Sequence, residues 1–564
     1  MTLRETNTFD FKSIRAPSEV MRLEHMGCCF PTRLSFMRIL IRKLIDNKSN
    51  IKTHIWDMDQ NGFGHAVLTV ELDSKTFSLI AFSNELEQSM RTDRVIASAW
   101  DASFALFDGI PSNSDIDRLK NQLPLQEAGR YSKSEIVISR ANKSVRIFNS
   151  IVDCLSRGLQ PPEELINRIG YLMRTTAVYG NGKFGICDRN EIKSSPIFSP
   201  PFQAEMLTVY LIRHFSIELV HHIAKKVNSK KFVFLDKRIQ RHIGIGNATG
   251  LGMAPFLINH PVLLNNWLMV KETALSRMLE KKTINKIDKN KVISLLNRAL
   301  NHLKEWITDD RRQKNRISRT IKEWIILKTE IDINTLSKLY PLKIIFDLTK
   351  NNSIECQELM ISLILEIGSN EVDGLENCLE SSLGVKLAPE MKLNELKNII
   401  ESNFRWVFDI NFELKASNSK FWYVSEEKLE PRLGNRFIEK GSELEQPLDI
   451  AKQIQNLHKD INNFSSEICV AEFLMKHPYH RYIVKRVQTN VWAPYSEIQS
   501  NLIGENCLPI DMLRFKLSFF GASKFDPKSD KWTRVNLYQG APLGDEIDSL
   551  ENDDWWLKPL NSNI

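Results

Sequence analysis

Two glycine-rich segments constrain this chain more than any other feature, because glycine lets a backbone turn sharply and approach a ligand closely. They are residues 174–183 (RTTAVYGNGK) and 244–252 (GIGNATGLG). Residues 203–227, which are rich in histidine, lie between them and have helical spacing. Both segments also carry polar and charged side chains that packing alone does not require. We therefore expect a functional site between two glycine-rich loops.

The side chains of these loops indicate how a ligand would be held. Arg174 offers a planar fork for a carboxylate or phosphate, and Lys183 adds a point charge. The residues expected to orient the ligand by hydrogen bonds are Thr175, Tyr179, Asn181, Asn247 and Thr249. The second segment does not match a dinucleotide fingerprint, since Thr249 stands where glycine is needed. The alternative interpretations are a helix C-cap at Gly180 or Gly182 for the first segment and a tight helix–helix turn for the second.

Histidine is the residue that titrates near neutral pH unaided, so we expect the acid–base group to be His25 or His260. His260 follows the second glycine loop directly. Cys28 precedes Pro31, and a thiolate at the start of a helix is favoured by the helix dipole. Cys28 is therefore a candidate nucleophile, although cysteine is also a common buried residue.

The helical segment between the loops offers a second kind of chemistry. His214, Glu218 and either His221 or His222 are spaced to share one helix face. Two histidines and one carboxylate can bind a single transition metal, as in non-haem iron oxidases and oxygenases. A polar helix face, or histidines hydrogen-bonded within a core, explains the same pattern without a metal.

A third function class follows from charge. The segment 281–328 is strongly basic, and a nucleic acid could contact it through Arg311, Arg312 and Arg316. The run from Arg311 to Arg316 has no interleaved aromatic side chains as in a stacking platform, and the usual meaning of such a pattern is a solvated helix face. The acidic stretch 545–554 has the opposite sign and is expected to dock on this basic segment.

The expected fold class is mostly α (α+β), with a large helical core and a small antiparallel β-meander near the N-terminus. Alternating residues predict strands at 53–58, 64–70 and 76–82, joined by turns such as Asn61-Gly62. Helical spacing predicts helices near 134–157, 162–177, 203–227, 260–280, 289–306, 310–329, 353–367 and 392–407. We divide the chain into an N-terminal α+β region with the meander (1–130), a helical core carrying the site (131–415) and a tryptophan-rich α+β region (416–564).

Composition limits the remaining choices. Eight scattered cysteines include no C-x-x-C pair, which disfavours a zinc ribbon or finger. No secretory signal and no long apolar run is visible, so a soluble cytoplasmic protein is expected. The net charge of +7 is compatible with anionic small molecules.

The leading hypothesis is therefore a cytoplasmic enzyme that binds a small anionic substrate or a nucleotide-like cofactor between the two loops. Arginine would anchor the anion and histidine would move protons. The alternatives are a helical iron oxidase or oxygenase, and a non-enzymatic factor that binds nucleic acid or protein. The sequence does not identify a cofactor beyond a nucleotide-like molecule or a single transition metal, and it leaves homo-oligomerisation open.

Overall fold

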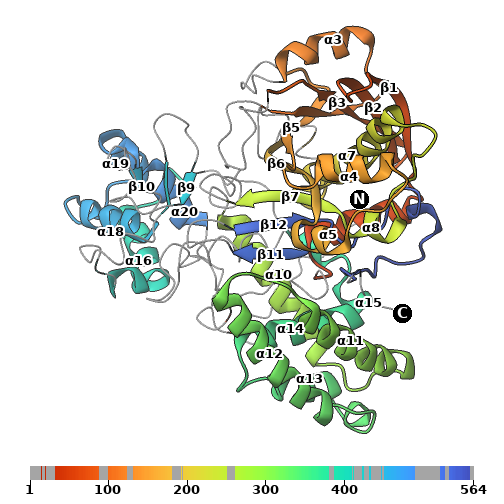
Figure 1. The fold of residues 1–564 in the computed structure, drawn as a ribbon. Coiled ribbons are helices and arrows are strands. Elements are labelled where there is room, and N and C mark those ends of the chain that lie inside the picture. The colour runs from red at the N-terminus through yellow and green to blue at the C-terminus, as the bar shows by residue number, and fades with distance from the viewer. Residues whose placement is uncertain are drawn as a thin grey trace.

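A nine-stranded sheet organises the protein (Figure 1). The computed structural model describes residues 14–15, 20, 32–87, 100–123, 131–180, 192, 195–249, 261–379, 387–409, 411, 422–424, 431–433, 446–447, 450–489, 521–527, 533–558 and 560. In spatial order the strands are β1 (Ile51–Met58), β2 (Gly64–Leu72), β3 (Lys75–Ser83), β4 (Ala102–Asp108), β5 (Glu135–Lys143), β6 (Tyr171–Gly180), β7 (Gly244–Thr249), β12 (Thr533–Leu537) and β11 (Lys524–Pro527). Neighbouring strands are antiparallel except β6 and β7, which are parallel.

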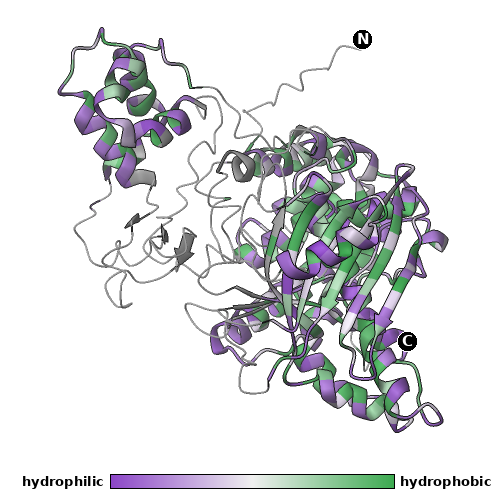
Figure 2. Ribbon diagram, turned by 90° about the horizontal axis from the view of Figure 1, so that it is seen from above, coloured by the Kyte–Doolittle hydropathy of each residue, from purple (hydrophilic) through white to green (hydrophobic). Residues whose placement is uncertain are grey.

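Both faces of the sheet are covered, which explains its long apolar strands. The 25-residue helix α7 (Gln203–Val227) contacts strands β3 to β7. It also contacts the helices α2 (Phe36–Asp46) and α4 (Phe148–Ser156). On the opposite face, Val67 and Ile80 of the sheet belong to a separate apolar cluster with α3 (Asn113–Gln122). Alternate residues of one strand thus enter different cores, and green apolar stretches run along several strands in Figure 2.

Further helices pack below the sheet in Figure 1 and complete the main core. They are α10 (Pro261–Leu279), α11 (Lys286–Glu305), α12 (Arg311–Glu330), α13 (Pro341–Asp347), α14 (Ile354–Ile367) and α15 (Ser369–Val372). The short helices α5 (Glu163–Ile169) and α8 (Lys237–His242) immediately precede the parallel strands β6 and β7. Because β6 and β7 are parallel neighbours, the ends of α5 and α8 lie at the same end of the sheet, where these two strands begin.

The expectation of a mostly helical fold with only a small N-terminal meander is wrong. The predicted meander is present as β1 to β3, but six more strands extend it, and all three predicted regions contribute strands. Residues 135–143 (EIVISRANK), expected to be helical, form the buried strand β5. A short apolar run fits a buried strand and a buried helix equally well. The expected helix 162–177 likewise divides at Gly170, whose left-handed backbone ends α5 before β6 begins.

A smaller group of helices, which we call the helical lobe, has a hydrophobic core of its own (Figure 2). It comprises α16 (Leu393–Asn403), the 3-10 helix η4 (Arg405–Asp409), α18 (Ile450–Ile461), α19 (Val470–Lys476), the 3-10 helix η6 (Pro478–His480) and α20 (Arg481–Thr489). A three-stranded sheet, β10 (Gln446–Pro447), β8 (Trp422–Val424) and β9 (Pro431–Leu433), is also present. Within the described residues, no helix combines the length and apolar character needed to cross a bilayer.

Candidate functional site

The described parts of the two glycine-rich segments, 174–180 and 244–249, lie side by side as the parallel strands β6 and β7. Arg174 opposes Gly246, and Thr175 opposes Asn247. Because successive residues of a strand point to opposite faces, Arg174 lies on one face of the sheet and the Thr175–Asn247 pair on the other. The structure therefore does not gather the predicted anchor and its hydrogen-bonding partners around one ligand.

The remaining residues of the predicted pocket are dispersed or lie outside the described residues. Tyr179 opposes Ile138 of β5, and Thr249 opposes Thr533 of β12. Thr175 Oγ1 and Asn247 Oδ1 are buried and have no hydrogen-bond partner in the described part of the chain. The predicted residues that lie outside the described ranges are His25, Cys28, Asn181, Lys183 and His260.

The predicted metal residues lie on α7, where two of the histidines already make structural hydrogen bonds. His222 Nδ1 accepts a hydrogen bond from Trp56 Nε1 at 3.1 Å, and its Nε2 lies 2.8 Å from the Asp59 carbonyl oxygen. His221 Nε2 accepts from the Leu235 amide at 3.2 Å. Its Nδ1 is 3.7 Å from Glu218 Oε1. These contacts tie α7 to neighbouring segments and do not favour a metal bound by this helix face.

His214 and Glu218 line a cavity of about 160 Å³ together with Asp545 and the buried Arg213. Arg213 donates to five backbone carbonyl oxygens at 2.6 to 3.2 Å, those of Gln240, Arg241, Ile243, Ala541 and Pro542. Burial lowers the pKa of Arg213 to about 10. Because its donors are consumed by backbone groups, Arg213 fastens the end of α8 and the segment 541–542 to α7.

The basic face predicted for nucleic acid is partly neutralised within the chain. Glu355 of α14 pairs with Arg319 at 2.8 Å and with Arg316 at 3.5 Å. Arg311 and Arg312 are exposed at the start of α12. The acidic stretch 545–554 does reach the basic segment through Asp554, which accepts from Arg298 of α11 at 2.8 Å.

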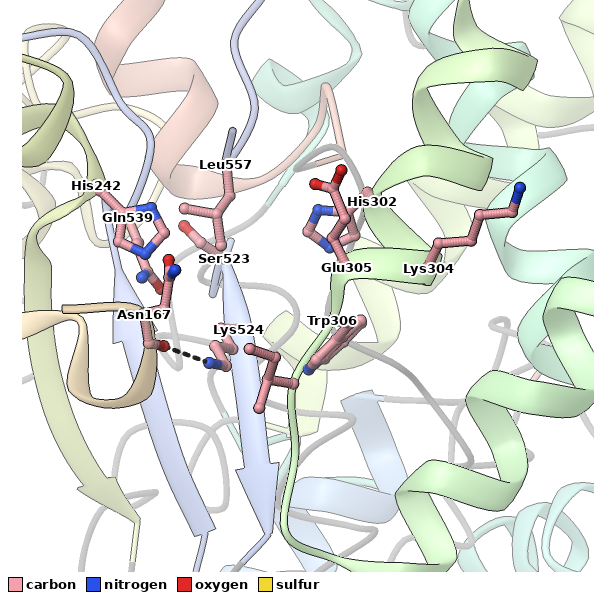
Figure 3. Close-up of a pocket in the computed structure, with 11 residues that line it drawn as sticks. Asn167, His242, His302, Lys304, Glu305, Trp306, Ser523, Lys524, Gln539 and Leu557 are labelled. Carbon is pink, nitrogen blue, oxygen red and sulfur yellow. Dashed lines mark hydrogen bonds between the residues drawn. The ribbon is translucent and has the colours of Figure 1, made fainter. Parts of the chain in front are cut away.

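A different cavity, of about 360 Å³, lies where several strands begin or end at one edge of the sheet. We call it the edge cavity; it is lined by Asn167, His242, His302, Lys304, Glu305, Trp306, Ile307, Ser523, Lys524, Gln539 and Leu557. Asn167 and His242 precede the parallel strands, Lys524 begins β11, and Gln539 follows β12. In Figure 3 these residues face His302, Glu305 and Trp306, which come from the C-terminal end of α11 and its continuation.

Two glycines make this wall of the edge cavity possible. A Cβ atom on Gly170 would lie 2.5 Å from Gln539 Nε2 and 2.6 Å from Asn536 Nδ2, and Gly170 has a φ of +71°. A Cβ on Gly244 would lie 2.4 Å from the Leu537 carbonyl oxygen. Gly244 donates its amide to the Gly170 carbonyl at 2.9 Å. Gly170 and Gly244 therefore allow β12 and the residues after it to pack closely against the starts of the parallel strands, and Gly170 leaves space for the side chain of Gln539.

Two buried histidines face each other across the edge cavity, and consecutive carbonyl groups of one segment hold both (Figure 3). His242 Nδ1 lies 3.1 Å from the Lys558 carbonyl oxygen, which makes Nδ1 the protonated nitrogen and leaves a lone pair on Nε2. Burial lowers the pKa of His242 to about 4, although this hydrogen bond favours the charged form. Burial also lowers the pKa of His302 to about 4, against a hydrogen bond to the Leu557 backbone. Both rings are therefore neutral at pH 7.

The residues that hold these carbonyls form what we call the C-terminal strap, residues 553–558. Asp553 accepts from Arg38 at 3.2 Å, Arg42 at 3.2 Å and Arg33 at 3.3 Å. Asp554 pairs with Arg298, whose guanidinium carbon also lies 3.8 Å from the centre of the Trp556 ring. The strap is thereby fixed to α2 and α11, and its last residues cover the edge cavity.

Several buried polar atoms around the edge cavity lack a partner. Among the described residues, no hydrogen bond satisfies His242 Nε2, Trp306 Nε1, Ser523 Oγ or Gln539 Nε2. Lys524 lies close enough to lower the pKa of both histidines, and its Nζ donates to the Asn167 carbonyl at 3.3 Å. Since buried polar groups are normally paired, such a set is typical of a site that a ligand completes.

Sequence reasoning missed this combination because its members lie far apart in the chain. His242 lies two residues before Gly244, the first residue of the second glycine-rich segment, and that nearness was the available signal. His302 sits in the last turn of an amphipathic helix, where histidine is ordinary. Lys524 and Gln539 carry no motif and reach the cavity only through the pairing of β12 with β7.

Comparisons with protein-family models, with curated proteins and with solved structures found no match.

Proposed function

We propose that the edge cavity binds a small anionic molecule and that His242 acts on it as a proton acceptor. The observation that carries this proposal is the group of buried, unpartnered polar atoms around a cavity beside Lys524. A volume of about 360 Å³ is in the range of small-molecule sites. The anionic substrate class expected from the sequence is thus retained, whereas Lys524 replaces Arg174 as the anchor.

The polar atoms divide into complementary roles. Lys524 supplies positive charge, and the N–H groups of Gln539 and Trp306 are donors for carboxylate or phosphate oxygens. Ser523 can donate or accept through its hydroxyl. His242 Nε2 offers a lone pair and no proton, which suits an acceptor from a ligand O–H, N–H or C–H group.

The acid–base role follows from the charges around His242. In the ligand-free cavity its pKa of about 4 makes it a weak base. A negative charge placed between Lys524 and His242 would offset the lysine and favour the imidazolium, so it would raise the pKa of His242. A base works best when its pKa is near the working pH. Binding of an anion would therefore activate His242 at the moment it is needed.

The experiment is ligand binding by calorimetry with a panel of probes: inorganic phosphate, citrate, benzoate and adenosine monophosphate. Lys524→Met is the test variant, and Lys304→Met is the matched control because Lys304 is an exposed lysine lining the same cavity. Loss of one charge-assisted hydrogen bond of about 1.5–3 kcal/mol predicts roughly 10- to 100-fold weaker binding for Lys524→Met. Lys304→Met should change affinity by less than about 3-fold.

Two outcomes would overturn the proposal: no probe binds the wild-type protein, or Lys524→Met binds as tightly as the control variant. His242→Gln separates binding from catalysis, because glutamine keeps a hydrogen-bonding side chain but cannot accept a full proton. We expect this variant to bind the probe that wild type binds and to lose turnover of any substrate found from it.

The other two hypotheses receive less support. An iron site on α7 would compete with hydrogen bonds that already occupy both ring nitrogens of His222 and Nε2 of His221. A nucleic-acid factor would need basic side chains that Glu355 and Asp554 partly neutralise. Neither site contains a comparable set of unpartnered buried polar atoms on a described cavity.

A further inference from the structure

The helical lobe contains a second chemically distinctive group, far in sequence from the residues of the edge cavity. Asp460 lies at the end of α18, His477 ends α19, and His480 lies in the 3-10 helix η6 that follows. Three consecutive elements of the lobe therefore bring one carboxylate and two imidazoles together.

The three potential ligand atoms are close to one another. Asp460 Oδ2 lies 2.7 Å from His480 Nε2 and 4.0 Å from His477 Nδ1. One ligand atom from each residue can be chosen so that all lie within 4.8 Å of one another, the arrangement required to surround one ion. Metal–nitrogen and metal–oxygen bonds of about 2.0–2.2 Å in a tetrahedral site place ligand atoms about 3.3 Å apart. Both observed distances differ from that value by less than an ångström.

Aromatic packing fixes the two imidazole rings before any ion arrives. Phe473 stacks on His477 with ring centres 5.1 Å apart and on His480 at 5.7 Å. Phe464 packs edge-on against His477 at 5.3 Å. His480 is buried, whereas His477 and Asp460 are half-buried, so the group opens toward solvent on one side. Such rigid, partly open placement is what a metal site needs and what a solvated polar surface lacks.

The Tyr479 hydroxyl bridges two of the three residues. It donates to Asp460 Oδ2 at 3.1 Å and lies 2.6 Å from His477 Nδ1. The Tyr479 side chain is 67 % exposed, so it can swing outward without opening the lobe core. The hydroxyl marks the position to which both ligands already point.

The same lobe contains a useful contrast. His458, two residues before Asp460 on α18, pairs its Nε2 with Glu401 Oε1 at 2.9 Å. That pair has no second histidine within its group, and among the described residues only the Asp460 group satisfies the three-ligand geometry. Helix α18 therefore contributes His458 to an ordinary histidine–carboxylate pair and Asp460 to the three-residue group.

We propose that Asp460, His477 and His480 bind one divalent transition-metal ion of the zinc class, with the remaining position open to water or to the Tyr479 hydroxyl. Two imidazoles and a carboxylate are borderline ligands that suit zinc or iron rather than calcium or magnesium. The ion would join the end of α18 to α19 and η6, and so clamp the helical lobe.

The test is zinc titration by calorimetry on the full chain after treatment with a chelator. Cobalt absorbance, whose intensity distinguishes tetrahedral from octahedral coordination, serves as the second readout. The test variants are His477→Gln and Asp460→Asn, and His458→Gln is the matched control. Loss of a supporting residue alone costs about 10–100-fold in metal affinity, so loss of a direct ligand should cost at least about 100-fold.

We expect one zinc ion per chain whose binding is lost in both test variants and retained within about 3-fold in the control. Unchanged affinity in His477→Gln and Asp460→Asn would overturn the proposal, as would the absence of zinc binding to the wild type. Circular dichroism of the metal-free variants shows whether they fold. His477 is half-buried and ends its helix, which makes its replacement the milder of the two.

Discussion

Replacing Asp553 by asparagine tests whether the C-terminal strap stabilises the main body through one carboxylate. The Asp553 side chain is 2 % exposed and is shared by Arg38, Arg42 and Arg33. Burial alone would raise the pKa of Asp553, but the charges of Arg38, Arg42 and Arg33 outweigh burial and lower it to about 2. Against an ordinary value of about 3.9, the shift corresponds to roughly 2–3 kcal/mol of stability at neutral pH.

The measured cost should be of this size. Asparagine keeps the volume and one oxygen acceptor but removes the charge, leaving Arg38 with Glu366 as its remaining carboxylate. Urea unfolding at pH 7, followed by tryptophan fluorescence, should show Asp553→Asn to be about 2 kcal/mol less stable than wild type. Asp548→Asn is the control, since Asp548 is exposed and should change stability by less than about 0.5 kcal/mol.

The pH dependence makes the prediction sharper. A carboxylate whose pKa is lowered by folding adds its full contribution to the stability of the folded state above its unfolded-state pKa. For Asp553 this stabilisation is lost as the pH falls from about 4 toward 2. The difference between wild type and Asp553→Asn should thus be the same at pH 7 and pH 5. A difference that already shrinks between these values, or one below about 0.5 kcal/mol at pH 7, would refute the reasoning.

Two further predictions concern the edge cavity. Gly170→Ala should lose probe binding and cost more than about 1 kcal/mol of stability, because its Cβ meets Gln539 Nε2 at 2.5 Å. Gly374→Ala is the control, since Gly374 also has a positive φ (+88°, against +71° at Gly170) but a Cβ there has nothing within 4 Å. The excess loss in Gly170→Ala, measured by urea unfolding and calorimetry, isolates the clash. The pKa values of His242 and His302 are about 4 in the folded protein, so the unfolded chain binds more protons below pH 6.5. As the pH is lowered from 6.5 to 4, the free energy of unfolding should therefore fall by up to about 1.4 kcal/mol per pH unit for each histidine. The double variant His242→Gln with His302→Gln should have a shallower slope, and an unchanged slope would contradict these values.

Individual helices and strands of this protein could be predicted where the apolar residues follow a single spacing, helical or alternating. The meander follows from the alternation of 53–58, 64–70 and 76–82, and helix α7 was predicted with the observed bounds because 25 residues of helical spacing leave little ambiguity. The extent of the sheet could not be predicted in the same way. β5 is buried on both faces, so the alternation that identifies a half-buried strand is missing.

The candidate site was harder still, since it depends on pairing between distant segments. Gly244 belongs to a segment that predicted a close approach of the backbone, but the partner that approaches is β12, almost 300 residues further on. No local pattern specifies which strand joins an open sheet edge. The sequence analysis therefore centred on segments adjacent to His242 in the chain, but it assigned the chemistry to Arg174, which lies within the β6–β7 ladder.

The pairing of β12 with β7 also determines when the nine-stranded sheet can be completed during synthesis. β7 is translated early, yet its ladder partner follows roughly 280 residues later, which corresponds to about 15–60 s at ordinary elongation rates. Throughout that interval β7 presents an unpaired edge, and unpaired strand edges invite association with other chains. The nascent chain should therefore depend on a chaperone at this stage, and a chain released before β12 has emerged would lack both the outer strands and the lysine of the edge cavity.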